Sequence, residues 1–252
     1  TIPDRMVISL KGKSALYKND MMMLEIIAGS NWTRPVYVAS TVGQDNYMNL
    51  GDNFIQEGLA NRISPFTTNA PGAKNFDSEK TYNNLMNRYK YGGLSTKGLY
   101  IDETVMRMCY THRRLFGQLA LNLIAEHKDD KALKVLQKAE KEIPDYNVPY
   151  NYISGGLDFA RAYALLGQKK RANEILNKVW NHSAQYAQWY LGLAQSRFTQ
   201  SQRDCMMHLS IMNQASELYG LIDKKQADEK AKTLNTLYNM YVGKGGNNYY
   251  EQ

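Results

Sequence analysis

The sequence predicts a mainly α protein of the α+β class, in which a small N-terminal α/β lobe is followed by a tetratricopeptide-like α-helical array. Two observations predict this division. Residues 1–100 mix short apolar runs with turn signals, whereas residues 101–252 carry one helical apolar pattern after another. A chain of 252 residues is long enough for two such parts. We therefore place the two domains at residues 1–100 and 101–252.

The N-terminal lobe is expected to begin with a helix, a loop and a strand. Asp20 is a good N-cap for a short helix, which Gly29 is expected to end. Pro35 favours an extended backbone before it, and the β-branched and aromatic residues 36–41 then predict a strand. The remaining expected elements are a strand around Gly58 and a helix over residues 79–90.

The second domain repeats its pattern of small and apolar residues. Two helix pairs carry it, and equivalent alanines of their second helices, Ala132 and Ala172, lie 172 − 132 = 40 positions apart. A tetratricopeptide repeat has a period of about 34 residues, and the additional residues fit the loop 144–154. Because one helix pair cannot bury its apolar face alone, the pairs are expected to stack into one array.

Two arginines are candidates for a binding groove in this array. Arg114 and Arg161 occupy equivalent positions on the first helices of the two pairs, which line the concave face of a tetratricopeptide stack. Such a pair can hold a carboxylate or a phosphate of a bound chain. The alternative interpretation is solvated surface charge.

A further helix is marked by three aromatic residues, Tyr186, Trp189 and Tyr190. Their i, i+3, i+4 spacing favours a packing stripe over a ligand platform.

Composition and motifs exclude several functions. The net charge is +7, but the basic residues do not cluster, so we expect no nucleic-acid partner. The four histidines lack metal-ligand spacing, and the sequence contains no phosphate loop, nucleophile elbow or calcium loop. We therefore expect no metal, no cofactor and no catalytic residue. Cys109 and Cys205 form no metal motif, and the sequence leaves open whether they are buried thiols or a disulfide.

One long segment carries a family resemblance, over roughly residues 20 to 115. The residues that carry it include Asn31-Trp32, Arg34-Pro35-Val36-Tyr37, Asp45-Asn46-Tyr47, Glu57-Gly58-Leu59-Ala60, Arg62, Gly92-Gly93 and Asp102-Glu103-Thr104. The segment resembles the C-terminal region of a Bacteroidetes family of multi-pass membrane proteins, formerly a domain of unknown function. That family is classed as similar to protein O-mannosyltransferases.

The resemblance implies a parent protein whose catalytic acid lies near an N-terminal bundle of membrane helices, outside this chain. The start at Thr1 is in keeping with a piece of a longer protein. The chain would then be an extracytoplasmic, periplasmic domain of a cytoplasmic-membrane protein. Its expected function is that of a non-catalytic accessory domain, attached to the membrane domain, that binds or positions an acceptor protein or glycan. The alternative is a tetratricopeptide-type protein-interaction scaffold with no sugar chemistry.

The resembling segment also contains five candidate ligand-binding residues, which are Trp32, Arg34, Asp45, Glu57 and Arg62. In a functional interpretation they line a cleft for a sugar or an acceptor segment. In a structural interpretation, Trp32 packs at the helix–strand junction and Arg34 pairs with an acid such as Asp45 or Glu57. The sequence leaves both interpretations open.

Overall fold

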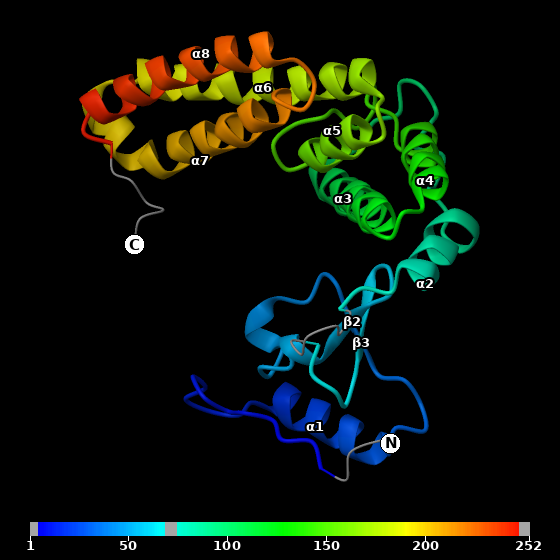
Figure 1. Ribbon diagram of the computed structural model, residues 1–252. Helices are drawn as coiled ribbons and strands as arrows, with labels where there is room; N and C mark the ends of the chain where they lie inside the picture. The colour runs from blue at the N-terminus through cyan, green and yellow to red at the C-terminus, as the bar shows by residue number, and fades with distance from the viewer. Residues whose placement is uncertain (1–4, 69–74, 247–252) are drawn as a thin grey trace. The chain divides into compact units, whose positions relative to one another are not determined.

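The computed structural model describes residues 5–68 and 75–246, and in these ranges it contains eight α-helices and one three-stranded sheet (Figure 1). This confirms the predicted class, an N-terminal α/β lobe followed by a helical array. The chain forms two compact units, residues 1–89 and 90–252. The segment 90–100 belongs to the helical unit, where Asn147 donates hydrogen bonds to the carbonyls of Leu94 and Thr96. The units therefore divide on the N-terminal side of the predicted boundary.

The N-terminal unit is built around a small antiparallel sheet with the strand order β1-β3-β2. Its elements are α1 (Lys18–Ser30), β1 (Tyr37–Ala39), η1 (Gln44–Asn46), η2 (Gly51–Asn53), β2 (Phe54–Gln56), β3 (Ala60–Ile63), α2 (Ser78–Asn83) and the π-helical turn η3 (Asn84–Arg88). Arg62 of the central strand is opposite Tyr37 of β1 and Ile55 of β2. The core of this unit consists of Ile27, Val38, Met48, Leu50, Phe54 and Ile63.

Three local predictions for this unit are wrong. The helix α1 begins before Asp20, whose carboxylate instead accepts a hydrogen bond from the Tyr17 backbone N–H across the first turn. The helix also passes through Gly29 and ends where Asn31 adopts the left-handed conformation, at φ 43°. Gly58 does not lie within a strand. It lies in the turn between β2 and β3 with φ +104°, a conformation that glycine adopts without strain.

The helical unit consists of six helices in sequential pairs. They are α3 (Glu103–Ala125), α4 (Asp129–Glu142), α5 (Gly156–Leu165), α6 (Lys169–Gly192), α7 (Gln195–Tyr219) and α8 (Lys224–Gly243). Short turns join the members of each pair, and Figure 1 shows α6, α7 and α8 packed side by side. Apolar residues at helical spacing, among them Phe116, Leu119 and Leu123 of α3, are fully buried between the helices.

The helices are more uneven in length than a regular repeat. A 34-residue repeat of two helices leaves at most about 15 residues for each helix. The helices α6 and α7 have 24 and 25 residues. The separate helix expected around Tyr186 is in fact the second half of α6, because nothing between Val179 and Tyr186 breaks the helix. The structure thus shows a helical array, and its assignment to the tetratricopeptide class remains a prediction.

A buried arginine holds the long connection between α4 and α5. Arg113 of α3 is fully buried and donates hydrogen bonds to the carbonyls of Ile143 at 2.8 Å, Val148 at 2.5 Å and Pro149 at 3.3 Å. Its guanidinium carbon lies 4.4 Å from the ring centroid of Tyr150. Burial lowers the pKa of Arg113, and the carbonyl oxygens replace the water that the cation has lost.

Candidate functional site

The candidate site in the N-terminal unit is centred on the carboxylate of Glu57. This side chain is only 5% exposed, yet three donors surround it. Arg62 Nε lies 2.6 Å and Lys80 Nζ 2.9 Å from Oε1, and the Tyr37 hydroxyl donates to Oε2 at 2.8 Å. We call Tyr37, Glu57, Arg62 and Lys80 the Glu57 cluster.

Four elements bring the Glu57 cluster together. Glu57 directly follows β2, in the turn that leads to β3. Tyr37 and Arg62 are register partners on β1 and β3, so their side chains emerge on the same face of the sheet. Lys80 lies in the first turn of α2, a helix capped by Asp77, whose carboxylate accepts a hydrogen bond from the Lys80 backbone N–H.

The turn itself is fixed from the side of α2 and η3. Asn84 donates a hydrogen bond to the Glu57 carbonyl at 2.9 Å, and the Tyr89 hydroxyl accepts one from the Leu59 N–H at 3.1 Å. A Cβ atom at Gly58 would lie 2.5 Å from the Tyr89 hydroxyl oxygen. The close approach of Tyr89 and the positive φ together require glycine at this position.

The Glu57 carboxylate is ionised despite its burial. Burial by itself raises the pKa of a carboxyl group, but the hydrogen bonds from Arg62, Lys80 and Tyr37 outweigh it and hold the pKa of Glu57 below its usual range. The hydrogen bond to Glu57 raises the pKa of Tyr37, so this phenol remains protonated. The cluster therefore presents partly exposed donors around a fixed negative charge. The lowered pKa of Glu57 makes its carboxylate a weak base, because the three donors stabilise the ionised form.

The structure brings only two of the five predicted ligand-binding residues into contact, namely Glu57 and Arg62. Arg34 is exposed and pairs with neither Asp45 nor Glu57, nor with any other residue in the described part of the chain, so the predicted ion pair is wrong. The Glu57 carboxylate instead forms ion pairs with Arg62 and Lys80.

Trp32 and Asp45 lie apart from this cluster. Trp32 is partly buried against the core of the N-terminal unit, in the left-handed conformation with φ 56°. Asp45 is exposed and lines a separate hollow of about 380 Å³ together with Lys11, Lys13 and Asn49. The joint role of the five residues in binding a ligand stays a prediction.

Sequence reasoning missed Tyr37 and Lys80 as members of the cluster. Tyr37 would follow from the strand register, which pairs it with Arg62. Lys80 comes from a helix more than twenty positions further along the chain, and no local pattern signals that contact.

The two candidate groove arginines lie on neighbouring helices of the helical unit. Arg114 of α3 and Arg161 of α5 are both exposed, and both act electrostatically on the carboxylate of Asp158. Burial raises the pKa of Asp158, and the two arginines partly offset that effect. Gly117 of α3 allows the close approach, because a Cβ there would lie 2.9 Å from the Asp158 Cβ. That the two arginines occupy equivalent positions of a repeat, and that they bind a ligand in a groove, both stay predictions.

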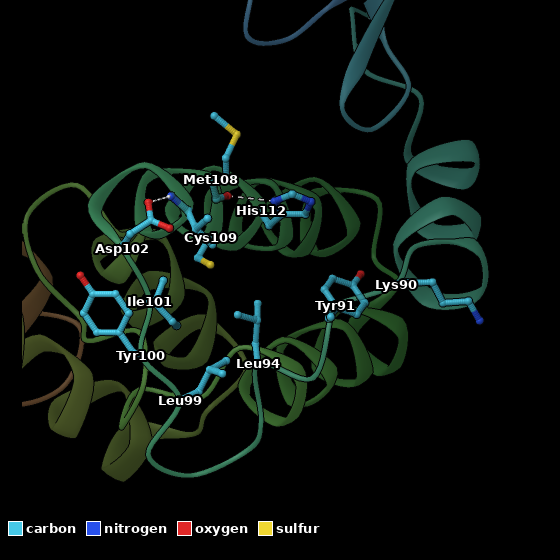
Figure 2. Close-up of a pocket in the computed structure, with 12 residues that line it drawn as sticks. Lys90, Tyr91, Leu94, Leu99, Tyr100, Ile101, Asp102, Met108, Cys109 and His112 are labelled. Atoms are coloured by element: carbon cyan, nitrogen blue, oxygen red, sulfur yellow. Dashed lines mark hydrogen bonds between the residues drawn. The ribbon is translucent and has the colours of Figure 1, made fainter.

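A mostly apolar hollow of about 370 Å³ lies between α3 and the segment that precedes it. Figure 2 shows Leu94, Ile101 and Cys109 directed toward the space between them. Asp102 at its rim caps α3 by accepting hydrogen bonds from the backbone N–H groups of Thr104 and Val105. The hollow suits an apolar group and offers no activated nucleophile, because burial raises the pKa of the Cys109 thiol.

Both cysteines are buried free thiols, which answers the question that the sequence left open. Within residues 5–68 and 75–246, no three His, Cys, Asp or Glu side chains are grouped so as to hold a metal ion. Across the same ranges, no helix combines the length and the apolar content that crossing a bilayer requires.

Comparison with known families relates the N-terminal unit to a membrane protein. Residues 1–81 match the family model described as TMEM260-associated domain 2. The match spans 81 of the 252 residues and does not extend into the helical unit. Comparisons with curated proteins and with solved structures find no match. The resemblance seen in the sequence is thus supported at a coarser level, as a relation to TMEM260 and to membrane glycosyltransferase-like proteins.

Proposed function

We propose that this chain is a non-catalytic extracytoplasmic domain of a membrane glycosyltransferase-like protein, in which it binds or positions an acceptor protein or glycan. The observation that carries the proposal is the position of the Glu57 cluster within the part of the chain that matches the family model. All four of its residues lie inside the segment 1–81 that matches the TMEM260-associated domain. The parent's attached membrane domain would supply the donor sugar and the catalytic acid.

The geometry of the cluster supports binding of a polar acceptor. Glu57 fixes Arg62 and Lys80 in place, and the Lys80 side chain remains about half exposed. Ammonium and guanidinium groups have more N–H donors than one carboxylate can accept. Their remaining donors are therefore available to carbonyl or hydroxyl oxygens of an acceptor, and preorganised side chains lose little entropy on binding.

The direct test has two parts. The gene upstream of the codon for Thr1 should encode several apolar segments, each of about 20 residues, as a membrane bundle requires. In the full parent protein, Lys80→Ala should then raise the KM for the acceptor about tenfold and leave kcat unchanged, because the interaction is made equally in the ground and transition states. Lys18→Ala is the matched control, since Lys18 is an exposed lysine of the same unit.

Two results would overturn the proposal. One is an upstream sequence that encodes only a signal peptide. The other is an active parent protein in which Lys80→Ala and Lys18→Ala have the same KM as the wild type.

A second candidate function is a protein-interaction scaffold with no sugar chemistry, and one observation favours it. Arg114 and Arg161 flank the same carboxylate on adjacent helices, as groove residues would. In this case peptides with a free terminal carboxylate should bind the purified chain. Binding should be lost in the Arg114→Ala, Arg161→Ala double variant and unaffected by Lys80→Ala.

A further inference from the structure

The sheet of the N-terminal unit places an amide, Asn61, on the face that otherwise packs into the core. Asn61 of β3 is opposite Val38 of β1, and Ile63 follows two positions further along β3, so the three side chains share one face. Val38 and Ile63 belong to the core. Asn61 is partly exposed, and its amide forms no hydrogen bond with any residue in the described part of the chain. A polar group among core residues normally has a partner, so the surroundings of Asn61 require an explanation.

Asn61 lines a hollow of about 590 Å³ within the N-terminal unit, which we call the amide hollow. The side chains that line it belong to Gln44, Tyr47, Asn49, Asp52, Phe54 and Asn61. Among these six, Phe54 alone is buried, and the others are partly or fully exposed. The polar atoms of the amide hollow can therefore be reached from solvent.

The polar groups of the amide hollow have unused hydrogen-bonding capacity. The side chains of Gln44, Asp52 and Asn61 form no hydrogen bond within residues 5–68 and 75–246. The Asn49 amide nitrogen donates to two backbone carbonyls, at 2.7 and 3.0 Å, and its oxygen remains an acceptor. Amide donors, amide acceptors and one carboxylate thus line the same small space.

Tyr47 adds an aromatic ring to the amide hollow. Its centroid lies 4.9 Å from that of Phe54, with an interplanar angle of 67°. Edge-to-face packing on a buried ring holds Tyr47 in place, while Tyr47 itself remains partly exposed. The lining therefore combines an apolar ring surface with several polar groups, as is typical of small-ligand sites.

The charge of the amide hollow narrows the class of ligand. Asp52 is the one carboxylate that lines it, and no lysine or arginine among the described residues does so. Lys11 and Lys13 line the adjoining hollow, together with Asp45. An anionic ligand would meet the Asp52 charge without a compensating cation, and a lipid chain would leave the amides without partners. A calcium ion normally requires more than one carboxylate, so a neutral polar ligand is favoured.

We propose that the amide hollow binds a neutral pyranose through hydrogen bonds to the Asp52 carboxylate and the Asn61 amide. A sugar hydroxyl donates to a carboxylate and also accepts from an amide nitrogen, whereas a peptide N–H only donates and a peptide carbonyl only accepts. The C–H face of the pyranose packs on the ring of Tyr47.

The amide hollow is a site separate from the Glu57 cluster. Asn61 and Arg62 are adjacent on β3, so their side chains lie on opposite faces of the sheet. The biological role of the sugar rests on the proposed function, because it identifies the acceptor as a neutral glycan. Binding itself needs neither the Glu57 cluster nor the parent's membrane domain.

The experiment is a titration of the purified 252-residue chain with methyl α-glucopyranoside and its manno and galacto epimers, followed by amide NMR shifts. We expect saturable binding of at least one epimer with a Kd on the order of 1 mM. The methyl glycoside of glucuronic acid has the same ring with a carboxylate. It should bind about tenfold more weakly or worse, because Asp52 repels it.

Two substitutions test the named contacts. Asp52→Asn and Asn61→Ala should each weaken pyranoside binding about tenfold or more, since the first removes the charge that strengthens a hydrogen bond and the second removes the amide. Asp52→Asn should also reduce the preference over the glucuronide. Asp45→Asn is the matched control, because Asp45 is an exposed aspartate that lines the adjoining hollow. Circular dichroism of each variant separates lost binding from lost folding.

Exposed aromatic rings of the helical unit are the other surface on which a pyranose can stack. The aromatic stripe of α6, which the sequence predicts to pack inside the protein, leaves Tyr186 45% and Trp189 59% exposed. Trp189→Ala should leave pyranoside affinity unchanged. Loss of binding in this variant would place the sugar on α6 and overturn the proposal.

Three further results would overturn it. The first is that none of the three pyranosides shifts the amides of the residues that line the hollow. The second is that Asp52→Asn and Asn61→Ala bind pyranosides as the wild type does. The third is that the glucuronide or calcium chloride shifts these amides where the neutral sugars do not, which would assign the hollow to an ion. Lys80→Ala should leave pyranoside affinity unchanged, so failure at the Glu57 cluster is distinguishable from failure at this site.

Discussion

The buried carboxylate of Glu57 accepts hydrogen bonds from three donors. A neutral side chain at this position would leave those donors without an ionised acceptor. Glu57→Gln should therefore lower the free energy of unfolding at pH 7 by about 2 kcal/mol. Urea denaturation measures this change. Glu25→Gln, at an exposed position of α1, is the control and should change the stability by less than about 0.5 kcal/mol. Equal stability of the two variants would show that the cluster does not hold the lobe together.

The same substitution should change how stability depends on pH. The pKa of Glu57 in the folded protein lies below its ordinary value of 4.5, so the folded state binds fewer protons than the unfolded state near that pH. The stabilisation from the ionised carboxylate is thus fully present above about pH 4.5. It is lost as the pH falls through the folded-state pKa, and Glu57→Gln should lack this loss.

His208 should make stability depend on pH in a separate window. Burial, together with His182, lowers the pKa of His208 from 6.5 to about 4, although Asp204 opposes the shift. Between these values the unfolded state binds more protons, so stability falls as the pH drops from 6.5 toward 4. His208→Phe should flatten this slope and be neutral or stabilising at pH 7, because it also removes the unpartnered Nδ1. An unchanged slope between pH 6.5 and 4.5 in urea unfolding would contradict this.

At the scale of elements, the β2–β3 turn is the part of the N-terminal unit where both the backbone conformation and the packing require one particular residue, Gly58. Gly58→Ala places a Cβ at φ +104° and 2.5 Å from the Tyr89 hydroxyl, so it should destabilise the protein by about 1–3 kcal/mol. Gly29→Ala makes the same chemical change inside α1 with open space around it, and should be neutral or stabilising by up to about 1 kcal/mol. In thermal unfolding, Gly58→Ala should lower Tm, whereas Gly29→Ala should leave it unchanged or raise it. A similar loss of Tm in both variants would contradict the role of Gly58 in the turn.

The connection between α4 and α5 depends on one arginine. Arg113→Met keeps the aliphatic stem but leaves the carbonyls of Ile143, Val148 and Pro149 without their donor. It should cost about 3 kcal/mol of unfolding free energy. Arg114→Met, one residue along α3 but exposed, should cost less than about 0.5 kcal/mol. Guanidinium denaturation distinguishes the two, and similar midpoints would exclude this role for Arg113.

The elements show what local sequence patterns can predict. Amphipathic spacing predicts the helical character of the second unit, because burial of an apolar face requires both the spacing and the helix, but it divides α6 into two helices. Boundaries were less predictable. The glycine pattern predicts a helix end at Gly29, but the left-handed turn falls at Asn31. It also predicts a strand at Gly58, whose positive φ belongs to a turn. A glycine permits several backbone conformations, and the packing around it determines which of them the folded chain adopts.

The candidate sites were harder to predict, because they depend on contacts between distant elements. Glu57 and Arg62 were found because they lie within one hairpin, whereas Lys80 required the packing of α2 against that hairpin. The same holds for His208, which lies far along the chain from the tyrosine of the α4–α5 connection that it meets. A sequence pattern indicates the spacing of apolar residues along one helix or strand. It does not indicate which helices and strands pack against one another.

At the scale of the whole molecule, the boundary between the units decides which fragments of the chain should fold on their own. The family match ends at residue 81, but the N-terminal compact unit extends to Tyr89. The additional residues include Asn84 and Tyr89, which hydrogen bond to the turn that carries Glu57. We therefore expect the fragment 1–89 to fold and the fragment 1–81 to be less stable by about 2 kcal/mol, since two hydrogen bonds to the turn are lost.

The complementary fragment 90–252 has its own buried core, from Phe116 of α3 to Tyr241 of α8. It should show a helical circular dichroism spectrum and one cooperative thermal transition. The fragment 101–252, cut at the boundary predicted from the sequence, is the control. It lacks the carbonyls of Leu94 and Thr96 that Asn147 binds, so it should melt several degrees lower, by about 4–8 °C if roughly 2 kcal/mol is lost. Equal melting temperatures for the two fragments would place the boundary near residue 100 instead.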